Sequence, residues 1–97
     1  MNALSLATGT FLNSSQTLFA RLDAETEDLW KDIVYKYMAK LYDAMDSSTS
    51  TEEQHKKLAV HAKMLKKLSI RRWIGFLDSN KLKKVSPDNQ KCLHAVR

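Results

Sequence analysis

The stretch from Gln54 to Val85 reads QHKKLAVHAKMLKKLSIRRWIGFLDSNKLKKV. Ten of its residues are Lys or Arg, and Asp78 is its one acidic residue. Its apolar residues recur at helical spacing, which predicts two successive amphipathic helices with basic outer faces, joined near Ser69. This stretch therefore indicates the fold class, which we predict to be all-α, and it also carries most of the positive charge.

Length and composition agree with a small helical bundle of three to four helices. The chain has 97 residues, of which 43% are hydrophobic and 28% are charged, as in one soluble domain. Its two glycines and one proline leave few positions for tight hairpin turns. We predict a helical domain over residues 15–97, preceded by a short N-terminal arm over residues 1–14 with a pattern that also fits a strand.

The segment before the basic stretch predicts a long helix that provides the other half of the core. An acidic run, Asp23 to Asp28, precedes it, and acidic side chains favour the first turn of a helix. The apolar residues that follow share one wide stripe at helical spacing. They are Leu29, Trp30, Ile33, Val34, Tyr37, Met38, Leu41, Tyr42 and Met45.

Helix starts and stops divide the rest of the chain. Ser50 and Glu53 fit a capping box, Ser69 can cap the next helix, and Ser86 followed by Pro87 predicts a short last helix or turn. The third helix is expected to bury Ile70, Trp73, Ile74 and Leu77 and to expose both of its arginines. Gly75 inside it predicts close approach of another helix or a local bend, and the run from Lys81 to Val85 is expected to be extended.

Charge is distributed very unevenly. Residues 1–53 hold four basic and nine acidic groups, whereas residues 54–97 hold twelve basic and two acidic groups. Such asymmetry indicates an anionic partner, most often nucleic acid, or contact with another copy or domain, although a solvated lysine-rich surface has the same signature. We predict that seven residues contact the phosphate backbone of DNA without reading its sequence. They are Lys56, Lys63, Lys67, Arg71, Arg72, Lys83 and Lys84.

Patterns that would indicate catalysis or a cofactor are absent from the sequence. It contains no GxxxxGK[ST], GxGxxG or GxSxG motif, and His55 and His61 are six residues apart, which does not suit two metal ligands on one helix face. We therefore expect no enzyme activity in this chain, no cofactor or metal, and no small-molecule ligand. Without a signal peptide or a membrane span, and with Cys92 as its one cysteine, the protein is expected inside the cell, in cytoplasm or nucleus.

Several phrases in the second half carry a family resemblance. They are Ala62–Ser69 (AKMLKKLS), the apolar pair Ile74 and Leu77, then Val85–Asp88 (VSPD) and Leu93–Arg97 (LHAVR). Over residues 25–97 the chain resembles the helical domain that precedes the ATPase in superfamily 3 primase-helicases of poxviruses, large DNA viruses, phages and mobile elements. The resemblance implies a non-catalytic module that contacts DNA, assists ring assembly and adjoins an ATPase domain. The family's catalytic motifs would follow Arg97, so none of its catalytic residues can be assigned here.

A second interpretation remains open at this point. A stand-alone viral or phage protein of this size could act as a regulator or inhibitor by docking its amphipathic helices into a groove of another protein. The two interpretations differ in the partner, which is DNA in the first and protein in the second.

Overall fold

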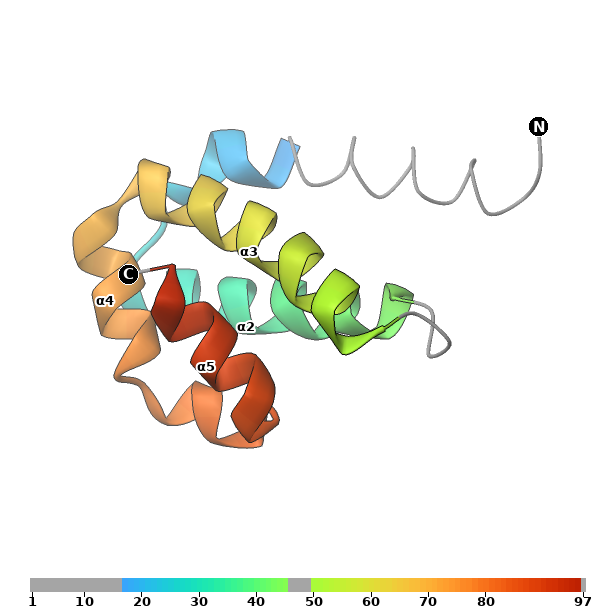
Figure 1. Ribbon diagram of the computed structural model, residues 1–97. Helices are drawn as coiled ribbons and strands as arrows, with labels where there is room; N and C mark the ends of the chain where they lie inside the picture. Colours follow the sequence, from blue (N-terminus) through green and yellow to red (C-terminus); the bar gives the residue numbers. More distant parts are fainter. Residues whose placement is uncertain (1–16, 46–49, 97) are drawn as a thin grey trace, which may run out of the picture.

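The computed structural model describes residues 17–45 and 50–96 (Figure 1). Residues 17–22 are helical and are followed by α2 (Glu27–Ala44), α3 (Thr51–Leu68), α4 (Ile70–Leu77), the 3-10 helix η1 (Asn80–Lys84) and α5 (Pro87–Ala95). The described ranges contain helices and no strand, which confirms the predicted all-α class. The predicted N-terminal arm, residues 1–14, lies outside these ranges.

Serine and threonine side chains set the start of every labelled α-helix. The hydroxyl oxygens of Ser50, Ser69 and Ser86 each accept a hydrogen bond from the backbone N–H three residues later, at 3.2–3.3 Å. Thr26 caps α2 in the same way at 3.4 Å. Because these bonds satisfy N–H groups that have no partner within the helix, each cap fixes where its helix begins. The three predicted serine caps are confirmed.

The helices pack in pairs around one core. α3 contacts α2, α4 and α5, whereas η1 contacts α2 and α4. In Figure 1, α3 passes in front of α2 and runs between the helical segment 17–22 and α5, α4 turns the chain at one end, and η1 lies at the opposite edge from α3.

The core contains three large aromatic side chains that are fully buried, Trp30, Trp73 and Phe76. The ring of Phe76 lies 6.4 Å from that of Trp30, edge to face, and 5.5 Å from that of Trp73. Leu65 of α3 and Leu93 of α5 are also fully buried in the same cluster. Aromatic and aliphatic burial of this kind supplies most of the driving force for folding.

Three side chains do not lie where the sequence pattern put them. Leu29 and Tyr42 are each 44% exposed and Ile70 is 51% exposed, although all three were expected in the core. At 3.6 residues per turn, Leu29 lies about 140° around α2 from the buried Val34, and Tyr42 lies about 80° from it, at the edge of the stripe. Ile70 occupies the first position of α4, at the corner beyond the core.

The run from Lys81 to Val85 is not extended, as had been expected. It overlaps the 3-10 helix η1, and this turn buries Leu82 among the three exposed lysines of the segment. The side-chain amide of Gln90 donates hydrogen bonds to the carbonyl oxygens of Leu82 and Val85, at 2.8 and 2.7 Å. The burial of one leucine and these two bonds explain why the segment coils.

Gly75 lies where α4 passes the start of α2, as its position inside a helix predicted. A Cβ atom at Gly75 would meet Glu27 Oε1 at 3.4 Å and Lys31 Cε at 3.6 Å, which are ordinary contacts with flexible side chains. We expect Gly75→Ala to raise the free energy of unfolding by about 0.5–1 kcal/mol, because alanine costs less backbone entropy in a helix. Urea denaturation would measure this change. A destabilised variant would show that the approach of α2 requires glycine.

Candidate nucleic-acid interface

Three of the predicted phosphate contacts form a row along the exposed side of α3. Lys56, Lys63 and Lys67 are all exposed. At 3.6 residues per turn and 1.5 Å per residue, they lie within about 20° of one line and span about 16 Å of the helix axis. We call these three residues the α3 row. The spacing matches a backbone that carries a phosphate every few ångströms.

The opposite side of α3 holds this row in place. Leu58, Ala62 and Leu65 are buried against the rest of the core. Rotation of α3 about its axis would expose these side chains to water, so the orientation of the row is fixed by the hydrophobic core. Lys56 pairs with Glu52 at 3.8 Å, but both side chains are largely exposed, and such a pair contributes little. The row therefore presents its charges to solvent.

The two arginines of α4 have different environments. Arg71 is exposed and follows the end of α3 closely in the chain. Arg72 is half-buried, and its Nη1 donates a hydrogen bond to the backbone carbonyl of Leu22 at 3.1 Å. The expectation that both arginines are exposed is wrong for Arg72, because its guanidinium ties α4 to the helical segment 17–22. We therefore assign Arg72 a structural role and keep Arg71, four residues after Lys67 in the chain, as a candidate phosphate contact.

Lys83 and Lys84 belong to a different part of the surface. Both are exposed on η1. Figure 1 places η1 at the edge of the domain opposite α3, so these two lysines do not extend the α3 row. The seven predicted contacts thus separate into the α3 row with Arg71, a structural Arg72, and the η1 pair.

Sequence reasoning missed three exposed residues beside the α3 row. Lys57 is exposed one position after Lys56, while Val60 and Met64 are 59% and 39% exposed. At 3.6 residues per turn, Val60 and Met64 lie about 40° and 80° around α3 from Lys56. The spacing of four residues between them could have identified this narrow apolar strip. Apolar side chains on a basic face are typical of protein-binding surfaces as well.

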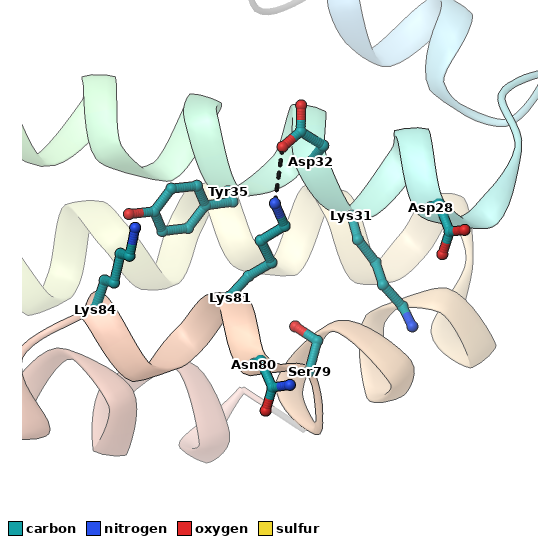
Figure 2. Close-up of a pocket in the computed structure, with 8 residues that line it drawn as sticks. All are labelled: Asp28, Lys31, Asp32, Tyr35, Ser79, Asn80, Lys81 and Lys84. Carbon is teal, nitrogen blue, oxygen red and sulfur yellow. Dashed lines mark hydrogen bonds and ion pairs between the residues drawn. The ribbon is translucent and has the colours of Figure 1, made fainter.

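A hollow opens between α2 and the segment 79–84, with a volume of about 580 Å³ (Figure 2). Asp32 lines this hollow, and its Oδ1 accepts a hydrogen bond from Lys81 Nζ at 3.0 Å. Lys36 Nζ lies 3.0 Å from Oδ2 of the same carboxylate. The hydrogen bond from Lys81, together with Lys36, lowers the pKa of the Asp32 carboxyl. Lys81 Nζ also lies 5.9 Å from the centre of the Tyr35 ring. These contacts hold η1 against α2.

His61 lies half-buried on the inner side of α3. Its Nδ1 is hydrogen-bonded to the buried hydroxyl of Tyr37 on α2, and the two rings lie 5.6 Å apart. Burial lowers the pKa of His61 below its ordinary value of 6.5, since the protonated ring loses hydration there. The pair joins α2 to α3 beneath the α3 row.

This pKa shift predicts that the domain is less stable in mild acid. With the pKa lowered in the folded state, the unfolded chain binds more protons as the pH falls through 6.5, so the free energy of unfolding falls. We expect this loss in urea denaturation between about pH 7.5 and pH 5.5, the range in which histidine titrates. His61→Gln should remove most of this dependence of stability on pH, whereas His94→Gln, at an exposed position, should retain the dependence. Equal pH dependence in both variants would contradict the assignment.

Other chemistry is not favoured by the geometry that the structure provides. Within residues 17–45 and 50–96, no group of three His, Cys, Asp or Glu side chains could hold a metal ion. In the same ranges, no helix has the length and hydrophobicity needed to cross a bilayer. Cys92 is half-buried, and its thiol donates a hydrogen bond to the backbone carbonyl of His55 at 3.3 Å. Burial raises the pKa of this thiol, which makes Cys92 a poor nucleophile.

Comparisons with known proteins give no further identification. No protein-family model, no curated protein and no solved structure matches this chain. Its function therefore has to be inferred from the chemistry of its own surface.

Proposed function

We propose that this domain is a non-catalytic helical module that binds the phosphate backbone of DNA through the α3 row and Arg71. The observation that carries the proposal is the alignment of three exposed lysines on a helix whose other side is fixed in the core. Each lysine that neutralises a phosphate releases a counterion and adds to affinity. Contacts of this kind position a protein on DNA and do not select a sequence.

The resemblance of residues 25–97 to the domain preceding the ATPase of superfamily 3 primase-helicases supports a place for this module in viral or mobile-element DNA replication. The acidic first half and the basic second half also favour contact between neighbouring copies, and such head-to-tail contacts can close into a ring. In this proposal, the α3 row faces DNA while the acidic start of α2 meets a neighbouring subunit or the adjoining ATPase domain.

Fluorescence anisotropy with a labelled DNA duplex tests the DNA proposal directly. If the three lysines of the α3 row and Arg71 each neutralise one phosphate, log K should fall with log salt with a slope of about −3.6. Affinity should then drop about 150-fold between about 50 mM and 200 mM salt. Binding that is undetectable at low salt, together with a monomer in sedimentation, would rule out both DNA binding and ring assembly.

A second function is favoured by one specific observation, the exposed strip of Val60 and Met64 beside the α3 row. A phosphate backbone makes no use of these side chains, whereas a protein partner can bury them. In this alternative the domain is a regulator or inhibitor that docks α3 against another protein. A partner retained from nuclease-treated lysate by the wild type, and lost with Val60→Ser and Met64→Ser, would favour the alternative. DNA binding that is unchanged by the same two substitutions would favour the first proposal.

A further inference from the structure

An apolar groove of about 210 Å³ runs between α2 and the segment formed by η1 and α5. Met38, Leu58 and Leu93 form its buried walls, and Tyr42 stands at its edge, 44% exposed. Figure 1 places η1, which contributes Lys84 to this groove, at the edge of the domain opposite α3. Leu58 of α3 lines the groove, but none of the three lysines of the α3 row does, so the groove is a separate feature from the row proposed to bind DNA.

Asn89 gives this groove a hydrogen-bonding group in an otherwise apolar wall. It lines the groove, is 5% exposed, and is the one polar residue in the buried class among residues 17–45 and 50–96. Its backbone N–H donates to Ser86 Oγ, but within those residues no hydrogen bond to its side-chain carboxamide is found. The carboxamide is not among the fully shielded polar atoms that lack a partner, so it is reached from the groove and offers both a donor and an acceptor to a molecule that enters.

The two ends of the groove carry opposite charges. Tyr35 and Lys84 line both this groove and the hollow of Figure 2, so they mark the end where the two meet. Figure 2 shows the Lys84 nitrogen beside the hydroxyl end of Tyr35. Asp43 lines the groove eight residues further along α2, about 12 Å away along the helix axis. The groove is thus cationic at one end and anionic at the other.

We infer that this groove binds a short segment of a partner protein that carries a large apolar side chain next to an acidic one. The apolar side chain packs against Met38 and Leu93, the backbone amide of the segment pairs with the Asn89 carboxamide, and the acidic side chain lies toward Lys84. Apolar walls disfavour a phosphate backbone, whereas a polar group placed in an apolar wall can fix the orientation of a bound segment by pairing with its backbone amide. An exposed tyrosine at the edge is also typical of protein interfaces.

NMR titration of the full ¹⁵N-labelled chain tests this inference with two small probes, N-acetyl-Trp-Glu-amide and N-acetyl-Trp-Lys-amide. Both probes should shift the side-chain amide resonances of Asn89. The Glu probe should bind about two- to fivefold more tightly, the range expected for one exposed ion pair. Lys84→Glu should reverse this preference. Lys83→Glu, the neighbouring exposed lysine that does not line the groove, should leave it unchanged.

Two results would overturn the inference. One is that neither probe moves the Asn89 resonances up to its solubility limit. The other is that the preference between probes is absent in the wild type or survives in Lys84→Glu. Since Lys84 is exposed, its replacement leaves the core intact, and a well-dispersed spectrum of the variant would confirm that it folds. Loss of DNA binding in an α3 variant would not affect this test, so the two proposals can fail independently.

Discussion

Replacing Leu65 with alanine is expected to lower the free energy of unfolding by about 2–5 kcal/mol. Leu65 is fully buried in the middle of α3, the helix that contacts α2, α4 and α5. The substitution removes apolar atoms and leaves a cavity that these helices cannot fill without moving. Because small domains have a total stability of only about 5–15 kcal/mol, this loss would be a large share of the stability of the protein. Urea denaturation followed by circular dichroism would measure the loss.

Val60 provides a matched control on the same helix. It is also an apolar residue of α3, but it is 59% exposed, so Val60→Ala should change stability by no more than about 0.5 kcal/mol. A loss for Val60→Ala as large as that for Leu65→Ala would mean that α3 is rotated relative to the orientation described. The α3 row would then not face solvent.

Replacing both Lys63 and Lys67 with alanine is expected to have the largest effect on DNA binding. The two side chains are exposed, one turn apart on α3, and together they supply two of the three charges of the row. Lys56 and Arg71 remain, so loss of two of four phosphate contacts should change the slope of log K against log salt from about −3.6 to about −1.8. Affinity would then fall only about 12-fold between about 50 mM and 200 mM salt, and it would be lower throughout at low salt.

The matched control removes the same amount of charge elsewhere. Lys40 on α2 and Lys91 on α5 are exposed lysines outside the α3 row. The Lys40→Ala, Lys91→Ala double variant should keep a salt slope near that of the wild type, because only diffuse attraction is weakened. If both double variants reduce the slope of log K against log salt by the same amount, the attraction to DNA depends on net charge and not on the α3 row.

Local sequence signals predicted most of the helix boundaries. Ser50, Ser69 and Ser86 each cap the helix that follows, since a hydroxyl at a helix start has a specific bond to make. Helical spacing also identified Trp30 and Trp73 as core residues. Signals of this kind depend on neighbours within one turn, which is why the chain alone reveals them.

Features that depend on how helices meet were harder to predict. Phe76 is fully buried between Trp30 and Trp73, and its position three residues after Trp73 was the one available signal. The coiling of η1 depends on Gln90 in the following helix, whose side-chain amide donates to the carbonyl groups of Leu82 and Val85. Spacing along one segment contains no information about such partners.

In the candidate site, too, local spacing predicted some features, and others depend on how the helices pack. The α3 row could be predicted, because its three lysines share one helix and therefore one face. The structural bond of Arg72 to Leu22 could not, since fifty residues separate the two. Nor could the sequence place Lys84 at the junction of two hollows or Asn89 within an apolar wall, because those positions arise only when α2, η1 and α5 pack together.

Chemical-shift mapping tests the central claim, that the exposed side of α3 binds DNA, most directly. The ¹⁵N-labelled protein would be titrated with a short DNA duplex at low salt. We expect progressive shifts at the amides of Lys56, Lys63, Lys67 and Arg71, which should reverse when salt is raised to about 200 mM. Shifts confined to η1 and α2, or no shifts at any ratio of DNA to protein, would contradict the claim.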